Sequence, residues 1–356
     1  MKAMLLGLLI AIGLAGAASA HETTRSYLTL DRQQSDVTAK LRVAFRDIEV
    51  AVWIDENLDG QITWGETTRR IDALTDYVTS ALRFETTAEC QMRRSDAGAS
   101  QDSGIAYLDL TFQVQCPDPQ ADLRVTSRMF AEFDPDHRLF LTATAGPASI
   151  NTLLWSAENS VLLTADSGGA PSSFFSYFKE GVRHLLQGAD HLVFLLVLVL
   201  PAVAAGGNTR RALLGVLAAV TGFTLAHALT LAAATTSLLR PPTALIEVLI
   251  AVSIVVTAID NLRPFIPAPR TAVAAFFGLI HGFGFATALG GLQLSGIGLA
   301  TALIGFNLGI EAAQIGFVLV LLPALLVVGH GRLLMRIGSV AAVAIGIYWV
   351  WARVAP

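Results

Sequence analysis

The fold of this chain is decided by residues 184–204, which have the sequence HLLQGADHLVFLLVLVLPAVA. The stretch is long and apolar enough to cross the hydrocarbon core of a bilayer as a helix of about 20 residues. Its first part nevertheless carries His184, Asp190 and His191, and ionisable groups inside a membrane are costly and usually functional. The stretch therefore predicts a membrane helix that holds a polar site.

The composition of the whole chain agrees with a membrane protein. The chain has 356 residues, of which 53% are hydrophobic and 15% are charged, whereas about a quarter of the residues in an ordinary soluble domain are charged. The formal net charge of −4 provides no basic surface for nucleic acid, and the sequence contains no Walker-type lysine motif for a nucleotide. We expect the partners to be the lipid bilayer and metal ions.

The part of the chain after residue 168 contains several long apolar segments. Each is close to the ~20 residues that a helix needs to span a bilayer, and residues 169–183 precede them as an interfacial amphipathic segment. The fold class expected for residues 184–356 is an α-helical polytopic membrane domain with six transmembrane helices. The expected spans are residues 184–204, 212–238, 243–262, 271–292, 299–328 and 333–351.

Two independent patterns predict the orientation in the membrane. Residues 1–20 resemble a signal peptide, with Lys2 before an apolar core and the small-residue cleavage signal Ala18-Ser19-Ala20. Arginines follow the first, third and fifth spans, and the positive-inside rule places those loops in the cytoplasm. We therefore expect a bacterial-type inner membrane protein whose N-terminal domain and C-terminus are extracytoplasmic.

Residues 21–168 predict a small β-rich exported domain with one helix. Apolar and polar residues alternate over residues 37–45, 48–54 and 108–114, which is the period of half-buried strands. Shorter strands are expected near residues 139–141 and 161–163. The helix is expected at residues 67–84, and residues 95–104 have the composition of a loop.

The cysteines and histidines of this exported domain suggest two further features. Cys90 and Cys116 are the only cysteines, and in an oxidising compartment such a pair predicts a disulfide. Signal cleavage would make His21 the new N-terminus, where it could form an exported metal site together with His137. The alternative is a frayed terminus and a histidine in a turn.

Residues 55–66 have the sequence DENLDGQITWGE, which fits a twelve-residue calcium loop. Such a loop takes oxygens from positions 1, 3, 5, 7, 9 and 12 and has glycine at position 6. The expected ligand residues are Asp55, Asn57, Asp59, Gln61, Thr63 and Glu66. Because the preceding segment has strand periodicity, we expect a single structural calcium site rather than a paired EF-hand.

A second set of metal-binding residue types lies inside the predicted spans. With the ~1.5 Å rise per residue of a helix, the expected topology brings these residues to one layer in the outer half of the membrane. His184 and His191 are spaced to share a helix face. Several imidazoles with carboxylates suit zinc, nickel, cobalt or copper better than magnesium or calcium. The predicted intramembrane metal residues are His184, Asp190, His191, His227, Glu247, His281, Asn307 and Glu311.

The membrane half resembles the HupE/UreJ family, in the branch with an exported N-terminal domain. The resemblance rests on four motifs in order: HLLQGADH at residues 184–191, FTLAH at 223–227, GLIHGFGF at 278–285 and FNLGIE at 306–311. It implies a metal permease of the nickel or cobalt type, associated with hydrogenase or urease. The spacing departs from the permease pattern, because five residues separate His184 from Asp190.

These observations favour a transporter or channel for a divalent transition metal, taken up from outside through the histidine–carboxylate cluster. Two alternatives remain open. The histidines could hold a zinc ion that activates water, as in an intramembrane hydrolase. The protein could also be a non-transporting accessory protein whose β-rich domain docks an exported or membrane metalloenzyme.

Overall fold

The computed structural model describes residues 24–33, 36–102, 104–118, 120–134, 137–145, 148–155, 160–164, 171–206, 208–236, 238–239, 241–284 and 296–355. The chain divides into two compact units. We call residues 22–176 the β-rich unit, and residues 177–290 with 303–356 the helical unit. Each unit is described by itself.

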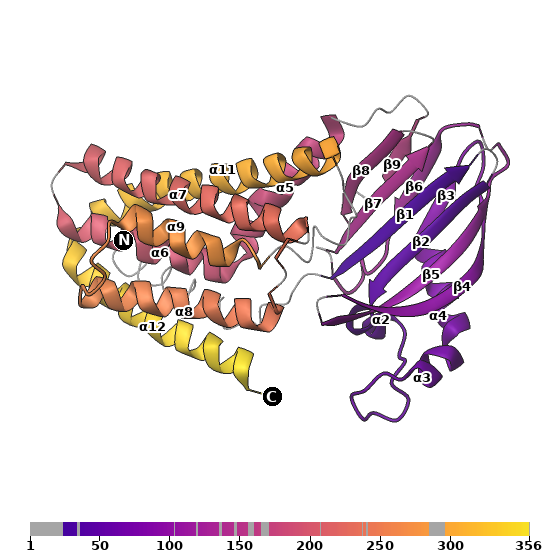
Figure 1. Cartoon of the computed structure of the whole chain (residues 1–356), viewed down its shortest axis with the longest axis horizontal. Helices are drawn as coiled ribbons and strands as arrows, with labels where there is room; N and C mark the ends of the chain where they lie inside the picture. Colours follow the sequence, from indigo (N-terminus) through magenta and orange to yellow (C-terminus); the bar gives the residue numbers. More distant parts are fainter. Residues whose placement is uncertain are drawn as a thin grey trace. The chain divides into compact units, whose positions relative to one another are not determined.

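The β-rich unit contains two sheets (Figure 1). The larger sheet has six strands in the order β4-β5-β2-β1-β7-β8, and its pairs are antiparallel except for the parallel pair β1–β7. In that order the strands are Gln91–Asp102, Ile105–Gln115, Asp36–Ala44, Arg25–Gln33, Arg138–Ala145 and Ala148–Trp155. The smaller sheet pairs β3 (Leu82–Glu85), β6 (Leu123–Ser127) and β9 (Ser160–Leu163).

The core of this unit follows from the alternation in β2 and β5. Alternate residues of each strand are buried, and they face one another across the pair, as in Ala39 opposite Phe112 and Leu41 opposite Leu110. Burying an aliphatic or aromatic side chain stabilises the fold by about 1.5–3 kcal/mol. The predicted β-rich region is confirmed, and these two strands lie where the alternation placed them.

Three local predictions in the β-rich unit were wrong. Residues 45–51 form a helix, α2 (Phe45–Ala51), rather than the start of a strand. The expected loop at residues 95–104 lies mostly in β4, an edge strand whose register shifts between Arg94 and Asp96. The expected single helix is divided into α3 (Trp64–Arg69) and α4 (Ile71–Ala81), and the chain after Ala81 is extended because it pairs in β3.

The predicted disulfide is confirmed. Cys90 and Cys116 are joined, with their Cα atoms 4.3 Å apart. Cys90 comes directly before β4 and Cys116 directly after β5. The bond therefore closes the open end of this hairpin.

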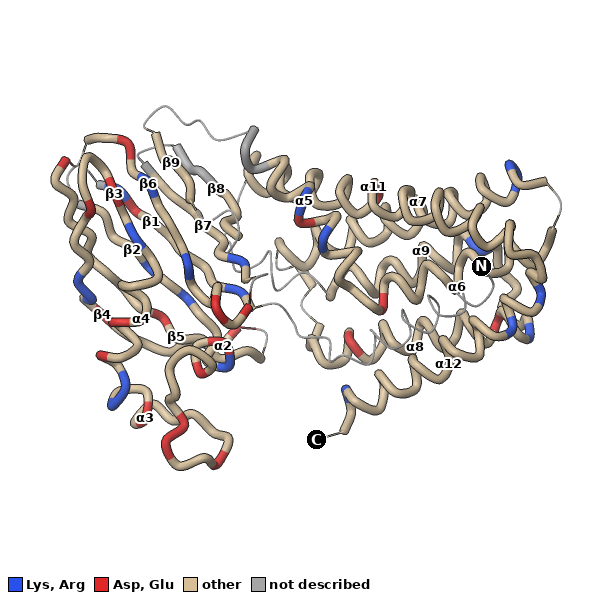
Figure 2. Tube along the Cα trace, turned by 180° about the vertical axis from the view of Figure 1, so that it is seen from behind, with Lys and Arg blue, Asp and Glu red and all other residues tan. Residues whose placement is uncertain are grey.

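The C-terminal part of the chain consists of helices that run side by side (Figure 1). Charged residues are scarce along them and frequent in the β-rich unit (Figure 2). The helices are α5 (Pro171–Gln187), α6 (Ala189–Ala205), α7 (Thr209–Thr235), α8 (Thr243–Leu262), α9 (Arg270–His281), α11 (Gly296–Val328) and α12 (Gly331–Val354).

The number of membrane spans differs from the six that we expected. Within the described residues, four helices (α7, α8, α11 and α12) are long and apolar enough to cross a bilayer. The pair α5–α6 is bent by 72° and adds a fifth span if it crosses as one unit. The expected fourth span begins as α9, which has 12 residues, and residues 285–292 of that prediction lie outside the described part.

Glycines allow close contact between two pairs of these helices. A Cβ atom added at Gly309 would collide with the backbone oxygen of Phe178, so α5 and α11 touch backbone to backbone. A Cβ atom at Gly278 would collide with the backbone oxygen of Phe223 in the same way, which joins α9 to α7. Small residues at such crossings are typical of membrane helices.

Candidate metal centre

The candidate site lies where several helices of the helical unit begin or end. Asp190 is in the first turn of α6, and Glu247 is near the start of α8. His281 is the last residue of α9, and Arg353 is in the last turn of α12. Helix starts favour negative groups and helix ends favour positive ones, so Asp190 and Arg353 both occupy suitable ends.

The break between α5 and α6 brings two of the predicted histidines together. Gly188 lies between the helices, and a Cβ atom there would press on the His191 ring. The expectation that His184 and His191 share one helix face was wrong, because the chain bends by 72° between them. Their ring centres are nevertheless 4.8 Å apart.

His281 lies next to His191, with 5.4 Å between the two ring centres. Its ring is buried and packs against Phe194 and Phe223 at 5.3 and 5.1 Å. The Nε2 atom is 3.0 Å from the hydroxyl oxygen of Ser253, and that hydroxyl donates to the backbone oxygen of Ile250 at 2.6 Å. The Ser253 oxygen must therefore accept from His281 Nε2, which leaves the Nδ1 lone pair without a hydrogen-bond partner among the described residues.

His227 has a similar arrangement on α7. Its Nδ1 atom is 3.2 Å from the Asn307 side-chain oxygen. The Asn307 amide nitrogen donates to the backbone oxygen of Leu303 at 2.8 Å, which fixes the orientation of that amide. Nδ1 therefore carries the proton, and the buried Nε2 has no hydrogen-bond partner within the described part of the chain.

Asp190 lies between His191 and Arg353, a residue that the sequence pattern did not indicate. Its Oδ1 is 2.9 Å from His191 Nδ1, and its Oδ2 is 3.5 Å from Arg353 Nη2. Arg353 also donates to the backbone oxygen of Glu247 at 3.2 Å. The Asp190 carboxylate is thus shared between an imidazole and a guanidinium group.

The remaining predicted residues make their hydrogen bonds outside the group formed by Asp190, His191 and Arg353. Glu311 accepts a hydrogen bond of 2.5 Å from Thr221 of α7, and the nearby Gln314 accepts one of 2.7 Å from Thr224. These contacts form a polar seam between α7 and α11. The structure thus brings His184, Asp190, His191 and His281 together, places His227 with Asn307 beyond Phe223 and Phe306, and pairs Glu311 with a threonine.

As they stand, these side chains are not arranged to coordinate an ion. Within the described ranges, no group of three or more His, Cys, Asp and Glu side chains has the geometry to hold a metal. The donor atoms are nevertheless of a kind that a transition metal binds. Buried nitrogens of His227 and His281 have lone pairs with no hydrogen-bond partner among the described residues. Imidazole nitrogen is a preferred ligand of zinc, nickel, cobalt and copper.

The comparison with known families identifies the helical part. The family model described as HupE / UreJ protein matches residues 160–353, which is more than half of the chain. The chain belongs to the HupE/UreJ family. No curated protein sequence matches it. The match includes every helix that carries the histidine cluster, whereas nearly all of the β-rich unit lies outside it.

The predicted calcium loop of this HupE/UreJ protein lies in the β-rich unit. Gly60 has φ +77° at the position where the loop pattern requires glycine. Asp55 accepts from the backbone nitrogens of Leu58 and Gly60 at 2.8 and 2.9 Å. Glu66 caps its own helix by accepting from the Thr63 backbone nitrogen at 2.9 Å and hydroxyl at 2.6 Å, and these bonds lower the pKa of its carboxyl.

The other predicted exported site involves His137. Its side chain is buried, its Nδ1 is 2.6 Å from the Thr24 hydroxyl, and its ring lies against Phe130. Burial lowers the pKa of His137 to about 3, so the ring is neutral at ordinary pH. His137 thus packs as a core residue, and His21 lies outside the described residues.

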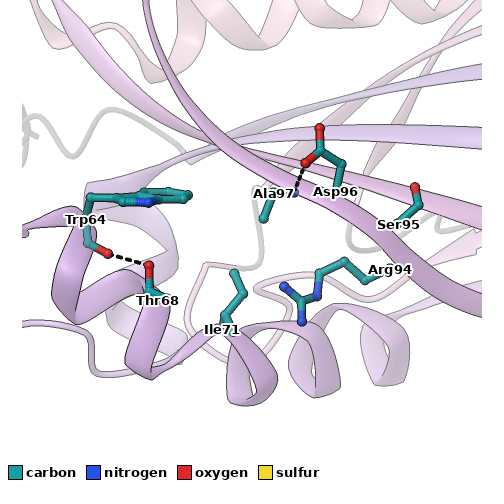
Figure 3. A pocket seen from close by; sticks show the side chains of 7 residues that line it. All are labelled: Trp64, Thr68, Ile71, Arg94, Ser95, Asp96 and Ala97. Atoms are coloured by element: carbon teal, nitrogen blue, oxygen red, sulfur yellow. Dashed lines mark hydrogen bonds between the residues drawn. The ribbon is translucent and has the colours of Figure 1, made fainter.

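The β-rich unit also contains a pocket of about 400 Å³ between α3, α4 and the edge strand β4 (Figure 3). Its lining includes Trp64, Ile71 and Arg94. Figure 3 shows Trp64 and Arg94 on opposite sides of the opening. The guanidinium of Arg94 is paired with Asp72 at 3.3 Å, and we assign no ligand to this pocket.

Proposed function

We propose that this HupE/UreJ protein binds a divalent transition-metal ion, nickel or cobalt in the first instance, at the histidine cluster and carries it across the membrane from the extracytoplasmic side. The family membership supports a role in nickel or cobalt supply. The observation that carries the proposal is the state of three imidazoles, His191, His227 and His281. In His227 and His281 one ring nitrogen is hydrogen-bonded to a side-chain oxygen. The Nδ1 atom of His191 lies 2.9 Å from Asp190 Oδ1, but without the geometry of a hydrogen bond.

This pattern is the usual second layer of a metal site. A histidine that binds a metal commonly donates its other ring N–H to a carboxylate or carbonyl oxygen, which fixes the tautomer and orients the ring. Asn307 and Ser253 occupy this position for His227 and His281. The Asp190 carboxylate lies close to the His191 ring, with 2.9 Å between Oδ1 and Nδ1. A purely structural role would not require the opposite nitrogens of His227 and His281 to remain buried without partners among the described residues.

The spacing of the rings also suits a shared ion. Two imidazoles on one tetrahedral metal, with metal–nitrogen bonds of about 2 Å, have ring centres about 5 Å apart. The observed separations are 4.8 Å for His184–His191 and 5.4 Å for His191–His281. Small rotations about side-chain bonds would therefore direct these rings at one ion without moving the helices.

The proposal is tested by cobalt uptake into proteoliposomes that contain the purified full-length protein and a metal-sensitive dye. Wild-type protein should raise the internal cobalt signal above that of empty vesicles, and His281→Ala should reduce the initial rate at least tenfold. His330→Asn is the matched control, because His330 is an exposed histidine at the start of α12 with φ +59°, a conformation that asparagine tolerates. Uptake that is equal in wild-type and His281→Ala vesicles would overturn transport through this cluster.

A further inference from the structure

Arg353 lies in the last turn of α12, beside a carboxylate of the proposed ion site. Its guanidinium is 3.5 Å from Asp190 Oδ2 and 3.2 Å from the backbone oxygen of Glu247. It also lies over the Trp349 ring, 5.9 Å from the ring centre. The side chains of Arg353 and Asp190 are both largely covered, at 18% and 19% exposure.

The guanidinium of Arg353 lies beside the carboxylate to which an incoming cation would bind. A carboxylate with little access to water needs a positive partner, and Asp190 is the carboxylate whose Oδ1 lies 2.9 Å from the His191 ring. Arg353 supplies that positive charge. A divalent ion bound between His191 and Asp190 would be repelled by the guanidinium. The ion and Arg353 therefore compete for the Asp190 carboxylate.

The contacts of Arg353 are weak enough to be exchanged. A distance of 3.5 Å is longer than the 2.7–2.9 Å of a strong charge-assisted hydrogen bond. Arg353 is also in the last turn of α12, which ends at Val354, and the ends of helices open with little free energy. The side chain can leave without breaking the packing of the helices.

We propose that Arg353 is a tethered cation that neutralises Asp190 when no metal is present and is displaced when a divalent ion binds. The divalent ion must then displace the Arg353 side chain, and with it the last turn of α12, in order to bind. This inference rests on the proposed function, since it concerns the same site. It assigns Arg353 as a residue that weakens metal binding by competition.

The test measures cobalt affinity by titration calorimetry on full-length protein in detergent. Arg353→Gln removes the competing charge and should bind cobalt at least tenfold more tightly than wild type. Arg353→Lys keeps the charge and should bind much less tightly than Arg353→Gln. Arg336→Gln is the matched control, because it removes a charge from the opposite end of α12, about 25 Å away along the helix, and should leave the affinity unchanged.

Asp190 must be necessary for the effect. In the Asp190→Asn background, Arg353→Gln should give no gain in affinity, because the carboxylate for which the two cations compete is absent. Equal or weaker cobalt binding by Arg353→Gln than by wild type would overturn the inference. If wild type binds cobalt and this gain is missing, only the tethered cation is overturned; if wild type binds none, the proposed function is overturned as well.

A second measurement uses only the wild-type chain and so does not depend on the folding of a variant. Trypsin must take the Arg353 side chain into its own pocket to cleave the bond after this residue. Cobalt should therefore increase the rate of this cleavage several-fold, as measured by intact mass, while cleavage after Arg336 is unchanged. A rate at Arg353 that cobalt does not alter would contradict displacement.

Discussion

Ser253 sets the tautomer of His281 through a single hydroxyl proton. That proton is used in the bond to Ile250, so the oxygen accepts from the imidazole. Ser253→Ala should release the ring and lower cobalt affinity about 10–100-fold, the usual effect of removing such a partner. Titration calorimetry on detergent-purified protein measures this change.

The matched control for Ser253 is on the same helix. Thr257 is also buried on α8, and among the described residues its hydroxyl bonds only to the backbone oxygen of Ser253, at 2.7 Å. Thr257→Val should leave the metal affinity within about twofold of wild type, since its hydroxyl has no part in orienting an imidazole. Equal losses in the two variants would show that the effect comes from packing of α8.

The sequence indicated the histidines of the cluster and their neighbours Asp190 and Asn307, but not Ser253 or Arg353. His191 and His281 stand out because an ionisable residue in an apolar run is rare. Ser253 does not stand out, because serines in membrane helices commonly bond to their own backbone. Arg353 was missed for a different reason: an arginine beside the end of a membrane helix is ordinary, and only the fold brings it to Asp190.

At the scale of helices, the contact of α5 with α11 depends on Gly309. A Cβ atom there would collide with the Phe178 backbone, whereas a Cβ atom at Gly316 on the same helix would meet nothing within 4 Å. Gly309→Ala should therefore lower the free energy of unfolding by about 1–3 kcal/mol. Gly316→Ala should be neutral or slightly stabilising, because alanine favours a helix. Thermal unfolding in detergent compares the two, and equal melting temperatures would contradict this contact.

The calcium loop is the second element with a testable state. We propose that calcium draws the Glu66 carboxylate away from Thr63, where it now caps α3, and into the ligand position that the pattern assigns to it. Calcium should then raise the melting temperature of the wild-type chain by mass action. Glu66→Ala should abolish this calcium-dependent shift.

The control for Glu66 is Glu56 in the same loop. Glu56 is at a position that supplies no calcium ligand in this pattern, and it pairs instead with Arg69 and Arg70 at 2.8 and 3.4 Å. Glu56→Gln should lower stability slightly but keep the shift that calcium produces. A wild-type chain that melts at the same temperature with calcium and with a chelator would rule the proposal out.

The errors at the scale of elements have physical reasons. Residues 48–54 alternate over too short a run to distinguish a strand from a helical turn, and only Asp47 and Ile48 of α2 are buried. The segment in β4 is polar because an edge strand needs little apolar surface, yet its backbone pairs with β5. The bend at Gly188 lies inside the span that we predicted at residues 184–204. It was missed because hydropathy alone does not record a bend.

At the scale of the whole chain, the division into a β-rich unit and a helical unit was predictable because the period of apolar residues changes near residue 170. The number of spans was less predictable, because α9 and the pair α5–α6 depart from the simple straight helix of about 20 residues. The convergence of helix ends around Asp190 depends on packing that no single segment encodes.

The central claim is that the histidine cluster binds a transition-metal ion, and metal analysis of purified full-length protein tests it most directly. Wild type and His330→Asn, dialysed against the same cobalt solution, should each retain cobalt in proportion to protein. His191→Ala and His281→Ala should lose most of it while remaining folded and inserted. Cobalt retained equally by all four proteins, or by none of them, would contradict the account.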